Sequence, residues 1–253
     1  LLMPSIQNDV DGRYRGLDQM IHTADFDYYS DFSLWDTFRT LHPFYVLAHP
    51  QLQLDLLRSL IRMSQDGGSL PRWPLAHGYT SGMVGSPATQ VFAGSFLKGM
   101  TTGWDHQFGF DIALAHASQV MPDANRRGIE AYLNLGWVPA DEFDTSVSLT
   151  LEYAWSDFSL AQWAKSIDHP AQERLVLQAQ QWHHHWSEEH QFMIGKNRDG
   201  SFTWSGSARQ WSDIYVEGNA WHYLWYVPYD VSAMIEVQHQ GDQQAFLTRL
   251  ANY

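Results

Sequence analysis

The sequence predicts a mainly α-helical fold, and three observations support that prediction. After residue 33, apolar residues recur at helical spacing in most segments. Proline or glycine stands at the expected ends of several segments, as at Pro50 and at Gly67 and Gly68. Short and long connections alternate, which is typical of antiparallel helix pairs stacked side by side. Periodicity supports no more than this class, although a closed ring of such pairs would form an (α/α) toroid with a pocket among its long loops.

The first 30 residues lack helical periodicity. Residues 8–12 have the composition of a turn, and residues 13–16 are typical of a strand or hairpin arm, so a short β-hairpin is expected near the N-terminus. A second hairpin turn is expected at residues 196–201. The predicted helices cover residues 33–48, 50–67, 87–99, 108–120, 125–133, 146–167, 171–186, 217–225, 231–238 and 242–252.

The composition indicates a chain that can bury a sizeable core. Hydrophobic residues make up 44% of the 253 residues and charged residues only 17%, so disorder is not expected. Because no repeat or low-complexity linker interrupts the sequence, we expect residues 1–253 to belong to a single domain. The absence of cysteine excludes disulfides, thiol catalysis and cysteine-based zinc sites.

Charge and motifs argue against several function classes. The net charge is −13, with 15 basic against 28 acidic residues, whereas nucleic-acid binding needs a basic footprint. No apolar run is long enough for a transmembrane helix, so no membrane span is expected. The sequence also lacks a Walker loop, a Gly-x-Gly-x-x-Gly motif and a Gly-x-Ser-x-Gly motif, which leaves nucleotide binding and serine-hydrolase chemistry unsupported.

Aromatic residues form 15% of the chain, with 12 Trp, 12 Tyr and 13 Phe. Aromatic faces stack on the C–H faces of sugar rings, while the polar tips of Trp and Tyr still make hydrogen bonds. An aromatic-rich core accounts for many of these residues. It does not account for Trp and Tyr gathered beside carboxylates in predicted loops. The acidic net charge is compatible with a neutral polyol substrate or with cations.

The first candidate site lies at the start of the helix predicted over residues 33–48. Asp36 and Arg39 are three residues apart and would share one helix face, with Trp35 beside them. One interpretation is a sugar subsite, in which Trp35 is a stacking platform and Asp36 accepts hydrogen bonds from hydroxyls. The other interpretation, favoured by spacing alone, is an Asp at a helix start that forms an intrahelical ion pair with Arg39.

The second candidate is Trp73, which stands in a loop between Pro71 and Pro74. The prolines would hold the backbone stiffly, and this suits a platform for a sugar ring. A Trp that merely packs over the loop is an equally good interpretation.

The third candidate is Glu217, in a segment where Asp213 and Glu217 stand among five aromatic residues. Aromatic neighbours would remove solvent from the carboxyl group and raise its pKa, as the general acid of a glycosidase requires. Gly218 would allow close approach of backbone or substrate. The alternative is that Glu217 occupies the first turn of a helix and interacts with its dipole, but the many amphipathic rings favour a functional role.

Three consecutive histidines, His183 to His185, suggest a metal site at first sight. Consecutive helical side chains point about 100° apart, so three adjacent histidines do not easily share one ion. We interpret them as a solvated helix end.

Seven short segments together form a specific pattern. They are Asp-Gly-Arg-Tyr-Arg-Gly at 11–16, Phe-Ser-Leu-Trp-Asp-Thr-Phe-Arg at 32–39, Leu-Pro-Arg-Trp at 70–73, Met-Val-Gly at 83–85, Gly-Trp-Val-Pro-Ala at 136–140, Thr-Leu-Glu-Tyr-Ala at 150–154 and Glu-Gly-Asn-Ala-Trp at 217–221. In this order they resemble glycoside hydrolase family 92, the calcium-dependent exo-α-mannosidases, and they span nearly the whole chain.

The resemblance implies an (α/α)6 catalytic domain, normally preceded by a β-sandwich domain. It implies single-step hydrolysis of terminal α-linked mannose from glycans, with inversion. Glu217 matches the family's general acid, and Trp35 and Asp36 match positions that line the terminal-mannose subsite. The other residues predicted to bind substrate are Arg39, Trp73, Asn219 and Trp221.

The resemblance also implies a calcium ion that holds two mannose hydroxyls. The family's general base is an Asp in a Gly-Asn-Asp-Asp-type motif downstream, where most calcium ligands also lie, and the sequence stops at Tyr253 before either. We therefore expect residues 1–253 to be an incomplete portion of the catalytic domain, without metal ligands and inactive alone. The expected location is periplasmic or extracellular, in a bacterium.

Two alternatives stay open. One is a non-catalytic glycan-binding domain on the same scaffold, and the other is a different (α/α)6 carbohydrate-active enzyme, such as a lyase, epimerase or phosphorylase. An Asp-Asp motif downstream would favour hydrolysis over binding. A requirement for phosphate would favour a phosphorylase.

Overall fold

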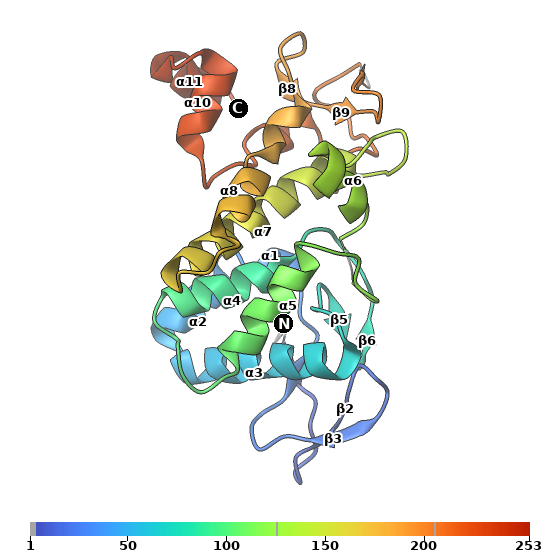
Figure 1. The fold of residues 1–253 in the computed structure, drawn as a ribbon, viewed down its shortest axis with the longest axis vertical. Helices are drawn as coiled ribbons and strands as arrows, with labels where there is room; N and C mark the ends of the chain where they lie inside the picture. Colours follow the sequence, from blue (N-terminus) through green and yellow to red (C-terminus); the bar gives the residue numbers. More distant parts are fainter. Residues whose placement is uncertain (1–3, 125, 205) are drawn as a thin grey trace. The chain divides into compact units, whose positions relative to one another are not determined.

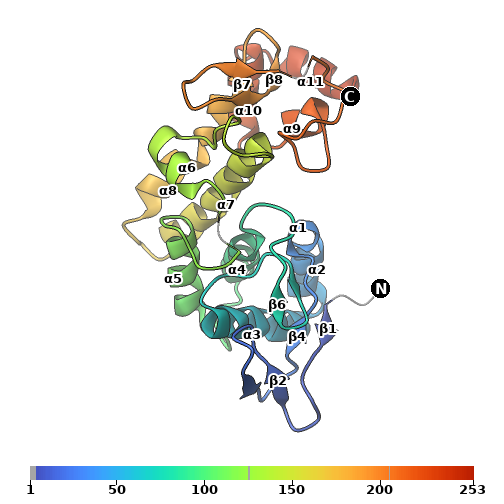
Figure 2. The ribbon, with the colours of Figure 1, turned by 90° about the vertical axis from the view of Figure 1, so that its right-hand side faces the viewer.

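The computed structural model describes residues 4–124, 126–204 and 206–253, and it confirms the mainly helical class. Within these residues the chain forms eleven α-helices, a 3-10 helix and ten strands of two or three residues (Figures 1 and 2). The chain divides into two compact units. Unit 1 comprises residues 1–126 and 159–175, and unit 2 comprises residues 127–158 and 176–253.

The N-terminal part of unit 1 contains the expected hairpin. The antiparallel pairs are β1 (Ser5–Ile6) with β4 (Tyr29–Ser30), and β2 (Arg13–Arg15) with β3 (Ile21–Thr23). The side chain of Tyr14 in β2 is buried, and its ring stacks on Tyr28 with a centroid distance of 3.8 Å. Its hydroxyl donates to Asp66 Oδ2 at 3.0 Å, so the hairpin is fixed to the last turn of α3 (Pro50–Gly67).

The helix predicted over residues 33–48 is two helices, α1 (Leu34–Thr37) and α2 (Leu41–Ala48). Pro43 explains the break. It stands in the first turn of α2, where its missing N–H costs nothing, but its ring would clash with the carbonyl four residues earlier if the helix continued back through Arg39. The prediction of one continuous helix was therefore wrong.

The longer helices of unit 1 enclose an apolar core. They are α3 (Pro50–Gly67), α4 (Pro87–Leu97) and α5 (His106–His116), with α2 packed on α3 and α4 packed on α5. Asp105 caps α5 through the backbone N–H of Phe108 at 3.0 Å, which is why α5 begins two residues before the predicted start. Rings from α4 and α5 surround Trp163, which is fully buried.

Unit 2 begins with α6 (Ile129–Leu135). A short helix was predicted from Asn125, which lies outside the described residues, and the helix observed begins at Ile129. The longest helix, α7 (Ser146–Ser166), matches its predicted range to within one residue and contributes residues to both units. The remaining elements are α8 (Gln172–Ala179), the 3-10 helix η1 (Gln181–His185), β7 (Trp186–Ser187), β8 (Phe192–Met193), β9 (Gly195–Lys196), β10 (Phe202–Thr203), α9 (Ala220–Leu224), α10 (Val231–His239) and α11 (Gln243–Ala251).

The helix predicted over residues 171–186 ends early and continues as η1. A 3-10 helix has three residues per turn, so Trp182 and His185 lie on one face, and both side chains are fully buried. His185 Nδ1 lies 2.7 Å from the carbonyl oxygen of Ile194, and its Nε2 lies 2.9 Å from Thr150 Oγ1. The interpretation of the three histidines as a solvated helix end is therefore wrong for His185.

The last two helices, α10 and α11, confirm the prediction for residues 231–252. They pack against each other, and each begins at an aspartate whose side chain accepts a backbone hydrogen bond, Asp230 from Ala233 and Asp242 from Ala245. The β9–β10 hairpin likewise confirms the predicted turn at 196–201.

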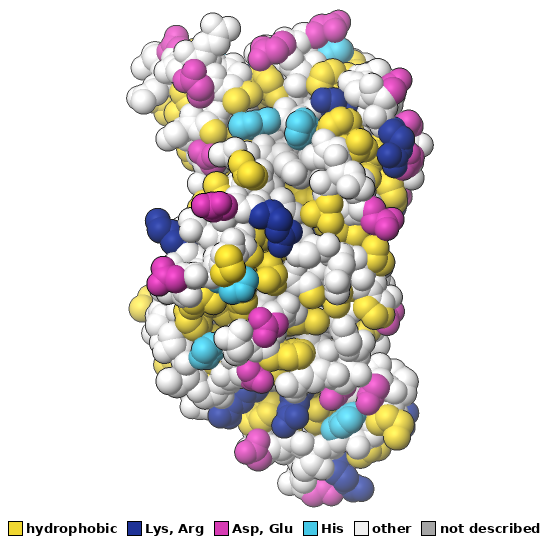
Figure 3. Space-filling view, viewed as in Figure 1, with side chains coloured by type: hydrophobic (Ala, Val, Ile, Leu, Met, Phe, Trp, Pro, Cys, Tyr) yellow, Lys and Arg dark blue, Asp and Glu magenta, His cyan; other side chains and the backbone are white. Residues whose placement is uncertain are grey.

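The surface carries charges of both signs. On the face shown in Figure 3, Lys and Arg side chains are scattered among Asp and Glu and do not gather into a basic patch. Along the described ranges, no helix combines the length and the hydropathy that crossing a bilayer requires.

Candidate active site

The segment that carries Glu217 is fixed along the start of α7. The backbone N–H of Thr145 donates to the carbonyl of Asp213, and that of Val147 donates to the carbonyl of Ile214 at 3.2 Å. Val216 is also bound to α7: its backbone N–H donates to the side-chain oxygen of Ser148 at 2.8 Å. The chain is thus held to α7 up to the residue before Glu217.

Glu217 itself turns the chain away from α7. Its φ angle is +46°, in the left-handed region that non-glycine residues rarely occupy. Such a conformation costs on the order of 1 kcal/mol or more and persists only where neighbours impose it. Here the neighbour is Val216, which is bound on both sides, since its carbonyl also accepts a hydrogen bond of 2.8 Å from the Tyr223 hydroxyl.

The Glu217 side chain is exposed among the described residues, contrary to the expectation that aromatic rings would cover it. The rings of Tyr215 and Tyr223 are buried and stack on each other at a centroid distance of 5.3 Å. Their hydroxyls donate to backbone carbonyls, that of Tyr215 to Met193 at 2.6 Å. The aromatic side chains therefore support the backbone beneath Glu217 rather than surround its carboxylate.

Asn219 begins α9. Its side-chain oxygen accepts from the backbone N–H groups of Trp221 at 3.1 Å and His222 at 3.3 Å, and His222 Nδ1 accepts in return from the Asn219 N–H. With Asn219 as the N-cap, the helix begins at Ala220, three residues after Glu217, and not at Glu217 as predicted. Its side-chain amide also donates to the carbonyl of Arg209 at 3.1 Å.

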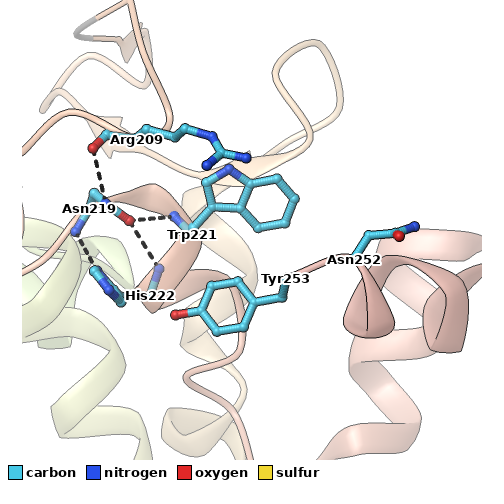
Figure 4. A pocket seen from close by; sticks show the side chains of 6 residues that line it. All are labelled: Arg209, Asn219, Trp221, His222, Asn252 and Tyr253. Atoms are coloured by element: carbon cyan, nitrogen blue, oxygen red, sulfur yellow. Dashed lines mark hydrogen bonds between the residues drawn. The ribbon is translucent and has the colours of Figure 1, made fainter.

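A pocket of about 360 Å³ opens beside α9 in unit 2 (Figure 4). The side chains around it are Arg209, Asn219, Trp221, His222, Asn252 and Tyr253. The sequence-predicted residues Asn219 and Trp221 are thus brought together here, and Glu217 is not one of the lining side chains. The Trp221 ring contacts the edge of Phe192, with a centroid distance of 5.0 Å, and the Arg249 guanidinium lies 5.6 Å from it.

Four lining residues were missed by sequence reasoning. Arg209 comes from the loop that precedes the Glu217 segment, and Asn252 and Tyr253 follow α11. Figure 4 shows the Arg209 guanidinium close to the indole of Trp221, with the Tyr253 ring on another side of the opening. No local pattern links these positions, because tertiary packing alone brings them together. His222 could have been found as the third residue after a capping Asn.

Trp35, Asp36 and Arg39 form a local group at α1 in unit 1. The Arg39 guanidinium lies over the Trp35 ring at 4.8 Å and over the Phe38 ring at 4.6 Å. Asp36 is exposed, and its Oδ2 accepts a hydrogen bond from the Ser33 hydroxyl. The stacking of Arg39 on Trp35 orients both side chains and leaves the Asp36 carboxylate at the surface.

Trp73 is also in unit 1 and is partly buried. Its loop is held by the neighbouring Arg72, which is buried and donates to the carbonyls of Gly82 at 2.9 Å and Ser81 at 2.6 Å. After Trp73 the chain enters β5 (Pro74–Leu75), which pairs with β6 (Gly78–Tyr79). These contacts hold the backbone on both sides of Trp73, and its role as a stiffly held sugar platform stays a prediction.

A buried carboxylate that received no role from the sequence lies on α7. Glu152 is fully buried, and its Oε1 accepts a hydrogen bond of 2.6 Å from the Tyr226 hydroxyl, which ties α7 to the loop after α9. With respect to metals, the residues that the structure describes contain no group of three or more His, Asp or Glu side chains placed to hold an ion. The described residues therefore do not by themselves fit a calcium site.

Comparisons with known proteins cover the whole chain. A family model described as the glycosyl hydrolase family 92 catalytic domain matches residues 1–253. Among solved structures, the family GH92 alpha-mannosidase BT3965 from Bacteroides thetaiotaomicron, in complex with mannoimidazole, is similar at 30% identity and a TM-score of 0.90. This match covers 99% of the present chain and 34% of the other. A search of curated proteins found no match.

A second similar structure is the family GH92 inverting mannosidase BT2199 from the same organism. It has 26% identity and a TM-score of 0.86, over 94% of this chain and 33% of its own. The chain thus spans about a third of the length of these two structures. Their similarity extends over nearly all of its residues.

Proposed function

This chain belongs to glycosyl hydrolase family 92, and on that premise we propose that the protein containing it removes terminal α-linked mannose from glycans by hydrolysis with inversion. The observation that carries the proposal is the match of the family's catalytic-domain model to the entire chain. The names of the two similar structures, an α-mannosidase and an inverting mannosidase, support the substrate and the stereochemical course. Because the chain spans about a third of those structures, the proposal concerns the complete protein.

We assign the role of general acid to Glu217. A proton donor must reach the glycosidic oxygen, at about 2.6–3.2 Å. The exposed side chain makes Glu217 accessible, and the hydrogen bonds at Val216 fix the backbone from which it projects. A fixed backbone reduces the entropy lost when the carboxyl group is aligned with the substrate, which favours proton transfer.

The pocket beside α9 is suited to a sugar of the substrate. The Trp221 ring offers an apolar face, while Asn219 and Arg209 offer polar groups close to it. In unit 1, the stacked pair of Trp35 and Arg39 and the exposed Asp36 carboxylate would line the terminal-mannose subsite. Trp73 would add an aromatic platform.

Inversion requires a second carboxylate that activates water, about 6.5–9.5 Å from the acid. We propose that this base and most ligands of a calcium ion come from residues of the complete protein outside this chain. When bound, calcium would orient sugar hydroxyls and withdraw electron density from them. The same premise supports an (α/α)6 toroid, a preceding β-sandwich domain and a periplasmic or extracellular location.

The general-acid assignment can be tested with two substrates of the complete protein. Glu217→Gln should lower kcat/KM for an α-linked mannobiose by about 10²–10⁴-fold, the usual contribution of a general acid. It should lower kcat/KM much less for a dinitrophenyl α-mannoside, because that leaving group departs with little need of a proton. The exposed Glu189→Gln is a matched control and should behave as wild type with both substrates. Equal losses by Glu217→Gln on both substrates would contradict the assignment.

The stereochemistry and the metal are tested on the same protein. The first mannose released should be the β-anomer in a time-resolved proton NMR spectrum, and an α-anomer would refute inversion. Treatment with a chelator should abolish hydrolysis, and added calcium should restore it. Activity that survives complete removal of calcium would overturn the calcium proposal but not the assignment of Glu217.

A further inference from the structure

A second cavity lies in unit 1, and it contains none of the predicted site residues. It has a volume of about 490 Å³, which falls within the ~300–1,000 Å³ usual for small-molecule sites. Its walls are α3, the loop between β3 and β4, and the loop that precedes α5. These three elements belong to one compact unit, so the cavity is built within a single body.

One face of α3 forms the longest wall. The lining positions 58, 61, 62 and 65 follow the spacing of successive helical turns, and they place two arginines and a glutamine around Ile61. Ile61 is buried, and so is the neighbouring Trp104 at the end of the opposite loop. The cavity therefore has an apolar part, formed by Ile61 and Trp104, and a polar part, formed by Arg58, Arg62 and Gln65.

Arg58 is held in place before any ligand arrives. Its Nε donates to the carbonyl oxygen of Gly103 at 2.6 Å, and its guanidinium lies 5.5 Å from the centre of the Phe26 ring. On the same side, Asp105 is fixed by capping α5. These contacts preorganise the two loops around the cavity, which reduces the entropy that a ligand would otherwise lose on binding.

The side chains of Arg62 and Gln65 can donate hydrogen bonds to a ligand. Both side chains are exposed, and within the described part of the chain neither makes a hydrogen bond to another residue. They stand next to each other at the cavity wall, on adjacent turns of α3. Asp25, on the facing loop, is exposed as well and supplies acceptor oxygens.

The lining charges indicate the class of ligand. The two arginines are balanced by Asp25 and Asp105, so the cavity has no net charge to attract an ion. Guanidinium and amide donors beside carboxylate acceptors match the adjacent hydroxyls of a sugar, and the apolar side chains of Ile61 and Trp104 match its C–H face. A phosphate or other anion would gain from the arginines but would be repelled by the two aspartates.

We propose that this cavity is a second, non-catalytic binding site for a neutral oligosaccharide. The choice of an α-mannoside as its ligand rests on the proposed function, because a part of the substrate glycan away from the cleaved bond would be held there. Arg62, Gln65 and Asp25 would make the polar contacts. Hydrolysis of a small mannoside does not need this site.

The test measures hydrogen–deuterium exchange of the complete protein carrying Glu217→Gln, which should not consume the sugar, with and without an α-linked mannotriose. We expect the sugar to slow exchange in peptides that cover residues 58–65 and 101–106. The double variant Arg62→Ala/Gln65→Ala should lose this protection, with binding weakened at least about tenfold, as loss of one or two hydrogen bonds predicts. Gln51→Ala, an exposed position at the start of the same helix, should keep it.

The result that would overturn the proposal is absence of protection in these peptides at millimolar mannotriose. Protection by inorganic phosphate in place of the sugar would also overturn it. Failure of this site and failure of the proposed hydrolysis are distinguishable, because turnover of a dinitrophenyl α-mannoside by the double variant should equal that of wild type. Melting temperatures of all variants show whether each is folded.

Discussion

The hydroxyl oxygen of Ser148 accepts a hydrogen bond of 2.8 Å from the backbone N–H of Val216, one residue before the proposed proton donor. Ser148 is fully buried in α7, so this contact transmits the position of the longest helix to the Glu217 loop. Val216 is half-buried, so water can replace a lost acceptor only in part, and loss of this hydrogen bond is costly.

Ser148→Ala removes that acceptor. We expect a loss of about 1–3 kcal/mol in the free energy of unfolding, because the Val216 N–H is left without a partner. We also expect kcat for mannobiose to fall by about tenfold or more, since the proton donor is displaced. Urea unfolding and steady-state kinetics measure the two effects.

The matched control is Ser156→Ala. Ser156 is equally buried in α7, but its hydroxyl donates to the carbonyl of Glu152 in its own helix at 2.9 Å. This change should leave kcat near wild type. If both variants lower kcat equally, the hydrogen bond between Ser148 and Val216 does not position Glu217.

Gly218→Ala should damage the same loop by overpacking. A Cβ atom at this buried position would lie 3.0 Å from Cε2 of Tyr223, whose ring is fixed by stacking on Tyr215 and by its hydroxyl. We expect destabilisation of about 1–3 kcal/mol and a lower kcat. Gly78→Ala is the control, because its Cβ would meet only the carbonyl of Leu75 at 3.7 Å. A folded, fully active Gly218→Ala protein would show that the loop tolerates displacement.

Two substitutions at Asn219 separate helix capping from its contact with Arg209. Asn219→Ala should lower the free energy of unfolding by about 0.5–2 kcal/mol, because α9 loses its N-cap. Asn219→Asp keeps the capping oxygen but cannot donate to the carbonyl of Arg209. We expect Asn219→Asp to have the same free energy of unfolding as wild type. Its KM should rise, because the loop that carries Arg209 loses its hydrogen bond to residue 219. Equal KM values for wild type and Asn219→Asp would exclude that role.

Burial of His185 predicts acid sensitivity. Desolvation lowers the pKa of His185 from its ordinary value of 6.5 to about 4. Between these values the unfolded chain binds a proton that the folded chain excludes, so stability present near pH 7 is lost as the pH falls toward 4, by an amount on the order of 3 kcal/mol.

The measurement is urea unfolding at pH 7 and pH 5. His185→Gln should be less stable than wild type at pH 7, because the contacts with Ile194 and Thr150 change. Its loss of stability between the two pH values should nevertheless be smaller than that of wild type. An identical loss in both proteins would mean that His185 does not contribute to the acid sensitivity and that other buried histidines, such as His42 and His116, account for it.

The fold was predictable where helices are long and their periodicity is unbroken. The range of α7 was predicted to within one residue because most of its turns carry buried side chains. The break between α1 and α2 was foreseeable from Pro43 alone, but the apolar pattern on both sides of it concealed the signal. The change from α8 to η1 was not foreseeable, since burial of Trp182 and His185 on one face depends on tertiary contacts.

Single residues of the candidate site were predictable from the sequence, but the side chains that surround them were not. Asn219 and Trp221 were found because they stand beside Glu217 in a segment with a family resemblance. Arg209 and Tyr253 were missed because no periodicity relates a loop to the residue after a distant helix. The expected cover of aromatic rings over Glu217 failed for a different reason: composition does not say on which side of the backbone the rings lie.

The left-handed backbone at Glu217 has a consequence for protein engineering. At φ +46°, glycine or asparagine would fit the turn with less strain than glutamate, so a stability-guided redesign would favour replacing it. Such a variant should fold better and turn over substrate more slowly. Thermostabilisation of this protein should therefore exclude position 217 from its search, however large the gain in melting temperature there.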